Sequence, residues 1–293
     1  MITVFGASGN TGGAAAAYLL KVGKKVRVVG RHKEKLARFI QAGAEAAVGD
    51  IENASFVRQA LTGAEAAYVL IPPNMATDDF RAYQQRLVDV YVAGIEATGV
   101  RHVVLLSSIG AHHREGTGPI VALNRFEGRL KEIPPVHALF LRAGFFMDNV
   151  LQGLHSVKAQ GVYTGPMPAE VAVPMIASTD IGNYAASRLE RLDFSGKSVV
   201  HLIGPKPVSQ TELVSILSDA VGKLVRYQQV SFEDVENGLK QAGLKPSVLS
   251  VFMEMYRGAG KGLVAPEEGG TVVQAQTTFE TFAKEVFAPA YRG

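Results

Sequence analysis

The sequence contains no cysteine and carries only a small excess of positive charge. Without cysteine, disulfides, thiolate metal sites and a cysteine nucleophile are excluded, which fits a reducing compartment. The formal net charge of +3 is too small to indicate nucleic-acid binding. No apolar run is long enough to cross a bilayer, and no signal-peptide pattern opens the chain. We therefore expect a cytoplasmic protein without membrane contact. No histidine or carboxylate cluster has metal-binding spacing.

What the sequence does contain is an alternation of short apolar runs and helical patterns over its first 150 residues. Strands are expected at 2–5, 25–29, 44–50, 65–73, 101–108 and 136–144, with helices between the first five at 11–23, 33–43, 53–63 and 78–99. The apolar runs are continuous, as in parallel strands that are buried on both faces. This order predicts the α/β class, with a Rossmann-type doubly wound parallel sheet.

The pattern changes beyond residue 150. A seventh strand at 199–204 is expected to return to the main sheet, and "SQTE" at 209–212 is a capping box that begins a helix. A strand at 224–230 and helices at 232–243, 246–258 and 278–287 complete an α+β pattern. We therefore predict a dinucleotide-binding domain over 1–153 and a smaller substrate or cap region over 154–293, partly interleaved with the first.

A glycine-rich loop lies between the first strand and an alanine-rich helix. "VFGASGNTGG" (4–13) has the spacing Gly-x-x-Gly-x-x-Gly, which lets the backbone approach a pyrophosphate at the helix N-terminus. It lacks the Gly-Lys-Ser/Thr ending of a P-loop. The alternative is an ordinary tight turn. The predicted cofactor contacts from this loop are Gly6, Ser8, Gly9, Asn10, Thr11 and Gly12.

No acidic residue stands at the end of the second strand, where an NAD site usually holds the ribose hydroxyl groups with Asp or Glu. Arg31 and Lys35 stand there instead. A guanidinium pairs with a 2′-phosphate, so the sequence predicts NADP(H) in preference to NAD(H). The alternative is a solvated basic surface. Asp50 and Ile51 are placed near the adenine, and the nicotinamide side is assigned to Ile71, Pro72 and Pro73.

Several stretches together resemble the NmrA-like family of atypical short-chain dehydrogenases: "VFGASGNTGG", "VRVVGRHKEKL", "LLSSIGA", "LRAGFFMDN" and the order of blocks from 171 to beyond 240. The pattern is particularly similar to NADP-dependent quinone and triphenylmethane-dye reductases. The resemblance implies the fold and a dinucleotide site. The family also contains nitrogen-metabolite regulators that bind NAD(P) without turning it over, so the resemblance leaves both an enzyme and a sensor open.

The sequence also lacks the Tyr-x-x-x-Lys pair with which typical short-chain dehydrogenases move a proton, because no tyrosine is followed four residues later by lysine. Alignment on the family's Glu-x-x-Leu helix, with Glu127 and Leu130, places Pro119 and Leu123 at the two positions. Neither can transfer a proton. The nearby Asn124 could hydrogen-bond a ribose.

Other polar and aromatic residues near the expected nicotinamide are candidates for the chemistry. Ser107 and Ser108 end the fifth strand and are predicted to contact the cofactor and a substrate oxygen, or else to cap backbone. His112 and His113 could supply a proton but are more often solvated. Phe145 is predicted to cover the nicotinamide. The predicted substrate contacts are Asn74, Phe146, Asn149, Met253 and Tyr256, with core packing as the alternative for the apolar ones.

These observations lead to one hypothesis and one rival. The hypothesis is an NADPH-dependent reductase that passes hydride to a quinone or another flat aromatic acceptor without a Tyr/Lys pair. Such an acceptor delocalises the incoming charge, so water can supply the proton. The rival is a non-catalytic NADP(H) sensor whose surface is recognised by a regulatory protein.

Overall fold

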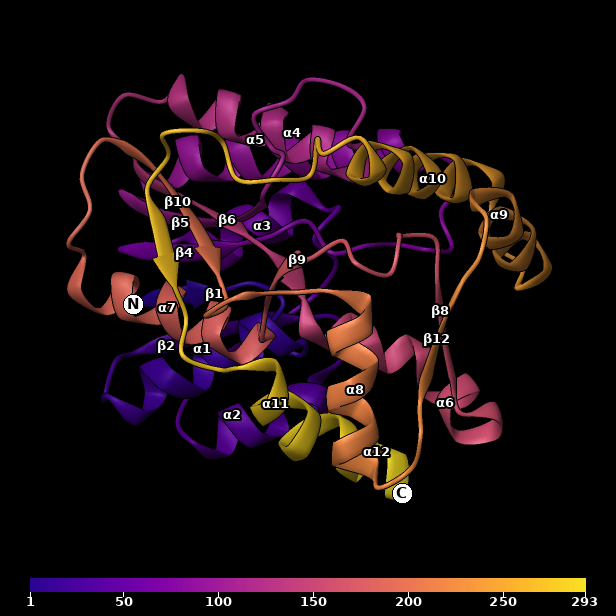
Figure 1. Cartoon of the computed structure of the whole chain (residues 1–293). Helices are drawn as coiled ribbons and strands as arrows, with labels where there is room; N and C mark the ends of the chain where they lie inside the picture. The colour runs from indigo at the N-terminus through magenta and orange to yellow at the C-terminus, as the bar shows by residue number, and fades with distance from the viewer.

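Eight parallel strands form the central sheet of this protein, for which a computed structural model describes all residues from 1 to 293 (Figure 1). Their order is β13-β10-β6-β5-β4-β1-β2-β3. The bounds are β1 Ile2–Val4, β2 Val26–Gly30, β3 Glu45–Val48, β4 Ala66–Val69, β5 His102–Ser108, β6 His137–Ala143, β10 Lys197–Ile203 and β13 Val272–Gln274. The sheet confirms the predicted α/β class.

Helices cover both faces of the sheet, as Figure 1 shows, and each face has its own apolar core. One core packs under α1 (Asn10–Lys21), α2 (Ala37–Gln41, after the 3₁₀ turn η1, Lys33–Leu36) and α7 (Ser178–Arg191). The other packs under α3 (Ala54–Leu61), α4 (Phe80–Thr98) and α5 (Val121–Lys131, after the 3₁₀ turn η2, Gly118–Ile120). Alternate strand residues contribute to opposite cores, so residues that are neighbours in a strand face different surroundings.

The sequence after residue 144 builds a third core against the side of the sheet. Its short strands are β7 Phe145–Phe146, β8 Val162–Gly165, β9 Val173–Ile176, β11 Pro207–Val208 and β12 Arg226–Gln229, in the sheets β11-β9-β7 and β12-β8. Its helices are η3 Met147–Gly153, α6 Leu154–Gln160, α8 Gln210–Val221, α11 Phe279–Phe282, the π-helical η4 Ala283–Phe287 and α12 Ala288–Arg292. Helices α9 (Phe232–Gln241) and α10 (Pro246–Gly260) lie outside this core, and α10 packs instead on Phe80 at the start of α4.

Local sequence signals for several of these elements are confirmed. Asn53 caps α3 by accepting from the Phe56 amide, and Ser209 and Glu212 form the predicted capping box of α8. The seventh predicted strand, β10, does return to the sheet beside β6. Helix α7 and the edge strand β13 were not predicted. The predicted domain boundary at residue 153 remains a prediction. Strands β10 and β13 follow this boundary in the sequence but belong to the main sheet. No helix is both long and apolar enough to cross a membrane.

The strand order creates a crevice at the carboxyl ends of β1 and β4. Strand β1 pairs with β2 on one side and with β4 on the other, so the chain turns in opposite directions after these two strands. In open α/β sheets, ligands bind at such a switch point. The glycine-rich loop follows β1, the segment 70–79 follows β4, and both therefore border this crevice.

Candidate functional site

The glycine-rich loop has a backbone that only small residues permit. Gly6 has φ +66°, a left-handed conformation that side chains disfavour. A Cβ on Gly12 would lie 2.4 Å from the Gly6 carbonyl oxygen, so the loop closes tightly on the first turn of α1. A Cβ on Gly9 would meet only that same oxygen, at 3.4 Å. Gly12 is therefore required by the fold, while Gly9 leaves open space above the loop.

The start of α1 presents backbone donors without acceptors. The amides of Ser8, Asn10, Thr11 and Gly12 take part in none of the hydrogen bonds of the protein, whereas that of Gly13 already bonds the Gly9 carbonyl. No acidic side chain lies in the first turn of α1. Free amides and the positive end of a helix are the features that bind a phosphate group. These residues have the features that a pyrophosphate site requires, and their contact with a dinucleotide remains a prediction.

Basic side chains line the turn after β2. Arg31, Lys33 and Lys35 are exposed and form no ion pair within the chain. Arg38, which the sequence did not identify as a candidate, lies beside the phosphate loop: its Nη2 is 2.9 Å from where a Cβ of Gly13 would stand. The signal that could have found it is its position one helical turn beyond Lys35. Unpaired cations here are free to meet an anionic ligand.

The residues assigned to the adenine side lie around Tyr83. The Tyr83 hydroxyl donates to the Pro72 carbonyl at 2.9 Å, which fixes the segment after β4. Burial raises the pKa of Tyr83 to about 12, with Glu52 and Asp50 adding to the rise while Arg31 opposes it. Asp50 is exposed and accepts from the Glu52 amide, and Ile51 and Ile71 pack against the core. Asp50 and Arg31 therefore both lie near Tyr83.

Ser107 has a partner that the sequence did not suggest. It is buried, and its hydroxyl donates to Glu127 Oε1 at 2.7 Å. Glu127 also accepts both Nε and Nη2 of Arg142, whose Nη1 reaches Glu267 at 2.6 Å. Burial opposes the charge of Arg142, yet these carboxylates raise its pKa. The hydroxyl of Ser107 thus belongs to a buried ion-pair network, and its catalytic role remains only a prediction.

Ser108 and the two loop histidines have different surroundings. The Ser108 hydroxyl is half-buried and donates to the Ile109 carbonyl at 2.9 Å, so its lone pairs remain free to accept. The rings of His112 and His113 lie 3.9 Å apart. Burial lowers the pKa of His112, with His113 lowering it further. Ser108 is therefore the serine better placed to contact a ligand, and His112 is disfavoured as a proton donor.

The two positions of the absent Tyr/Lys pair lie in an apolar setting. Pro119 is in η2, and Leu123 is in the first turn of α5. Both line a cavity of about 190 Å³, with Ile71, Pro73, Phe80, Gln84, Ile120 and Phe252 as the other lining residues. Asn124 donates to the Ala111 carbonyl at 2.8 Å. No titratable side chain takes the place of the pair in this cavity.

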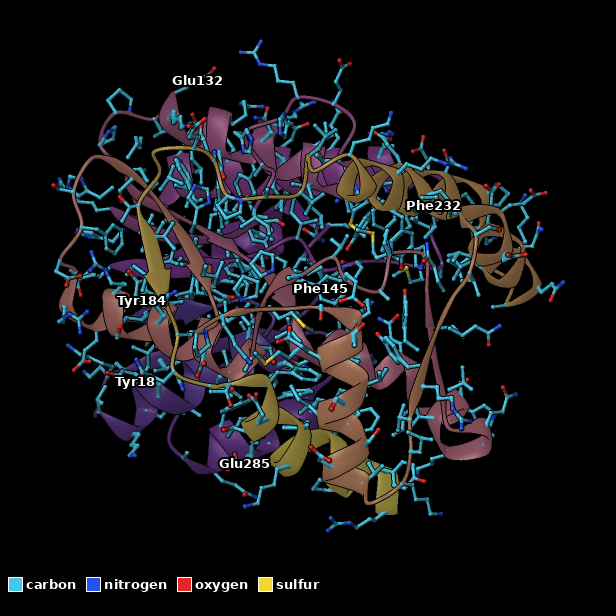
Figure 2. The ribbon with its side chains drawn as sticks, viewed as in Figure 1. Tyr18, Glu132, Phe145, Tyr184, Phe232 and Glu285 are labelled. Atoms are coloured by element: carbon cyan, nitrogen blue, oxygen red, sulfur yellow. The ribbon has the colours of Figure 1, made fainter.

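The residues predicted to touch an acceptor come from three segments. Phe145 is 38% exposed, and Figure 2 shows it near the centre of the view, above α8 and below α10. Phe146 packs partly against the core under α1, and its contact with a substrate remains a prediction. Asn149 is half-buried, whereas Met253 on α10 is only 1% exposed. Met253 is thus mainly a core residue.

Asn74 and Tyr256 are the two remaining residues that are predicted to contact a substrate. Asn74 accepts from the Ala76 amide at 3.1 Å and so shapes the loop after β4. Tyr256 is half-buried on α10, and burial raises its pKa. Its helix packs closely on the loop after β5, because Gly258 lies against the Gly116 carbonyl and Glu254 accepts from the Gly116 amide at 3.0 Å. Helix α10 therefore holds the region that follows Ser108.

The NmrA-like family model matches residues 1–263. The chain belongs to this family. It is 24% identical over 259 residues to the NAD(P)H azoreductase of Xenophilus azovorans, covering 87% of this chain and 86% of that protein. It is 26% identical over 269 residues to quinone oxidoreductase 2 of Escherichia coli, covering 89% of each chain. The fold matches the crystal structure of Citrobacter triphenylmethane reductase complexed with NADP(H) with a TM-score of 0.80 at 23% identity, over 97% of this chain and 99% of that one.

Sequence reasoning missed one residue of this NmrA-like protein that connects the parts of the site. Asp148, in the segment after β7, accepts hydrogen bonds from Asn10 in the glycine-rich loop and from Ser178 at the start of α7. The Asn10 side chain is therefore engaged by protein, and its backbone amide is what remains for a ligand. Only the tertiary structure brings residues 10, 148 and 178 together.

Proposed function

We propose that this protein is an NADPH-dependent reductase that transfers hydride to a neutral, flat aromatic acceptor, with quinones as the principal class. Two features of the site together carry the proposal. The backbone amides of Ser8, Asn10, Thr11 and Gly12 have no acceptor, and the side chains of Arg31 and Lys35 form no ion pair. The family relatives named above are reductases of azo, quinone and dye acceptors and support the same reaction type.

The preference for NADPH rests on the charge around Arg31. A 2′-phosphate would find Arg31 and Lys35 without ion-pair partners of their own, and the residue directly after β2 is Arg31 instead of an acid that could bind the ribose hydroxyls of NADH. Charge-assisted hydrogen bonds to a guanidinium are about twice as strong as neutral ones. Arg31 therefore discriminates by gaining a partner in NADPH that it lacks in NADH.

When bound, NADPH supplies the hydride, and the chain supplies position. Its glycine loop orients the dinucleotide, Ser108 offers a lone pair beside the acceptor, and Phe145 covers the reacting rings. The cavity beside Leu123 keeps this side apolar. Because the chain places no proton donor at positions 119 and 123, the proton comes from water after charge has spread over the acceptor.

A neutral acceptor fits the side chains that wall the site. Asn74, Phe145, Phe146, Asn149 and Tyr256 are all uncharged, and the carboxylate between Phe146 and Asn149, that of Asp148, accepts hydrogen bonds from Asn10 and Ser178. The charged residue within this stretch of α10, Glu254, pairs with Arg81 of α4. A sulfonated azo dye would therefore lose water without gaining a counter-ion, and such desolvation is costly.

The test measures NADPH consumption with neutral quinones, a cationic triphenylmethane dye and a sulfonated azo dye, using NADPH deuterated at the transferred position. We expect fastest turnover with quinones and a primary isotope effect. Gly9→Val is the matched control, because its side chain would occupy the phosphate space without displacing the loop, so it should fold and not turn over. Normal NADPH binding without turnover of any acceptor would contradict the reductase and favour the sensor.

A further inference from the structure

Asp148 joins three segments that are distant in the sequence. Its Oδ1 accepts from Asn10 Nδ2 at 2.9 Å and from Ser178 Oγ at 2.6 Å, and its Oδ2 accepts from the Ser178 amide at 3.0 Å. Asn10 begins α1 directly after Gly9, and Asp148 follows Phe145 and Phe146 by a few residues. One carboxylate thus connects the phosphate loop with the segment that covers the acceptor.

The carboxylate also replaces a missing helix cap. Helix α7 begins after Ala177, whose side chain cannot accept from the first amides of the helix. Asp148, thirty residues earlier, accepts from the first of these amides instead. The start of α7 is pressed against the start of α1, because a Cβ on Gly182 would lie 2.3 Å from the Thr11 carbonyl oxygen. The position of Asp148 is therefore fixed relative to the glycine loop.

The charge of Asp148 has no cationic partner within the chain. Three hydrogen-bond donors and the positive end of α7 stabilise it. The free amides of Asn10, Thr11 and Gly12 lie one side chain away, where the pyrophosphate is proposed to bind. Asn10 stands between the two negative groups as a neutral donor, so it can bond the carboxylate without adding charge beside a phosphate.

We propose that Asp148 is a positioning residue that holds the Phe145–Asn149 segment to the phosphate loop, and that Asn10 is the neutral spacer between Asp148 and the dinucleotide. The acceptor arm of this inference rests on the proposed reductase function, whereas the binding and stability arms do not. Loss of the hydrogen bond between Asn10 and Asp148 should displace the Phe145–Asn149 segment more than it disturbs the phosphate site. A second carboxylate at position 10 should weaken the phosphate site itself.

The experiment compares Asp148→Asn, Asn10→Asp and the double exchange Asn10→Asp/Asp148→Asn. Asp148→Asn places amide donors opposite the donors of Asn10 and Ser178, and Asn10→Asp places two carboxylates side by side. The double exchange again places one amide beside one carboxylate. We expect both single variants to lower the urea midpoint and the double exchange to recover most of it. Asp219→Asn is the matched control, since Asp219 is exposed and forms no hydrogen bond or ion pair.

Two further readouts separate positioning from simple stability. NADPH affinity, by nicotinamide fluorescence, should fall at least tenfold whenever position 10 carries a carboxylate, including in the stable double exchange, and less than threefold in Asp148→Asn. At saturating NADPH, the acceptor KM should rise about tenfold in Asp148→Asn, with a smaller change in kcat, and recover in the double exchange. Asn10→Ala, which removes the bond without adding charge, should repeat the KM effect of Asp148→Asn.

The results that would contradict the roles of Asp148 and Asn10 differ from those that would contradict the reductase proposal. If NADPH affinity survives in the double exchange, no phosphate lies beside position 10 and the spacer is wrong. If the acceptor KM of Asp148→Asn and Asn10→Ala matches that of the parent, the positioning role is wrong. If the parent turns over no acceptor, the reductase proposal fails by itself, and the fluorescence and urea measurements still decide whether Asn10 separates Asp148 from the dinucleotide.

Discussion

Arg142 and Glu127 form a two-point ion pair in the interior, with Nε 2.9 Å from Oε1 and Nη2 2.7 Å from Oε2. Their side chains are 4% and 2% exposed. Arg142 lies on β6 and Glu127 on α5, so the pair fixes this helix to the sheet where Ser107 ends β5. Ionised groups in such a place are stable only with their partners, because burial removes the water that would otherwise solvate them.

Glu127→Ala should therefore destabilise the fold by about 3–5 kcal/mol, the usual cost of leaving one member of a buried pair without its partner. Urea unfolding followed by circular dichroism measures this loss. Glu132→Ala is the matched control, because Glu132 follows the same helix but is 74% exposed beside Arg129. Equal midpoints for the two variants would show that the Arg142–Glu127 pair does not stabilise the fold.

His201 makes the stability of this region depend on pH. It is fully buried, and neither ring nitrogen has a hydrogen-bond partner. Burial lowers its pKa, and Arg142 and His112 lower it further, while Glu267 and Glu127 oppose the shift. The unfolded chain therefore binds more protons than the folded one below the ordinary histidine pKa of about 6.5. The stability due to neutral His201 is present above that pH and is lost as pH falls below it.

His201→Leu should flatten this dependence, because leucine keeps an apolar volume and takes up no proton. Unfolding free energies at pH 7.5, 6.5, 5.5 and 5.0 measure the slope for parent and variant. His155→Gln is the control, since His155 is exposed. His112 and His102, whose pKa values burial also lowers, should leave part of the slope in place. An unchanged slope in His201→Leu would rule out His201 as its source.

The sequence predicted most strands of the main sheet because the signals for them are local. Continuous apolar runs define β1 to β6, and Asn53 and Ser209 identify two helix starts by their own hydrogen bonds. Strand β13 has only three residues, so its pairing with β10 depends on tertiary contacts and left no readable pattern. Helix α7 begins without a local cap, because Asp148 supplies it from another segment.

The candidate site divides in the same way. The glycine loop and Arg31 were accessible from spacing alone, because backbone conformation and charge at a strand end follow from neighbouring residues. The partners of Ser107 and Asn10 were not, since Glu127 and Asp148 reach them from distances of 20 and 138 residues. The sequence does not show which face of the sheet a serine hydroxyl at a strand end occupies, or which carboxylate it contacts.

Arg31→Ala should weaken NADPH and leave NADH nearly unchanged. The guanidinium is exposed and unpaired within the chain, and we propose that it binds the 2′-phosphate, so its loss would remove a contact that NADH does not make. One charge-assisted hydrogen bond corresponds to about ten- to a hundredfold in affinity. Fluorescence titration of both nucleotides measures the ratio. Lys25→Ala, an exposed cation at the opposite end of β2, should leave that ratio at the parental value; equal affinities in the parent would contradict the proposed preference.

Ser107 and Ser108 provide a matched pair, because neighbouring residues of a strand face opposite sides of the sheet. Ser107→Ala removes a buried donor to Glu127 and should lower the free energy of unfolding by about 1–3 kcal/mol, with kcat retained for the folded protein. Ser108→Ala should leave stability nearly unchanged, since its hydroxyl donates only to the adjacent Ile109 carbonyl, and should lower kcat/KM for quinones about tenfold by removing a substrate contact.

Ser108→Phe extends the same comparison. The phenyl ring should occupy the space of the acceptor and abolish turnover. NADPH should still bind, because the free amides and Arg31 belong to other segments. Nicotinamide fluorescence checks binding, and NADPH consumption with a quinone checks turnover. If instead Ser107→Ala loses turnover at full stability and Ser108→Ala does not, then the hydroxyl on the Glu127 side of the sheet contacts the acceptor, and the assignment of the two serines must be reversed.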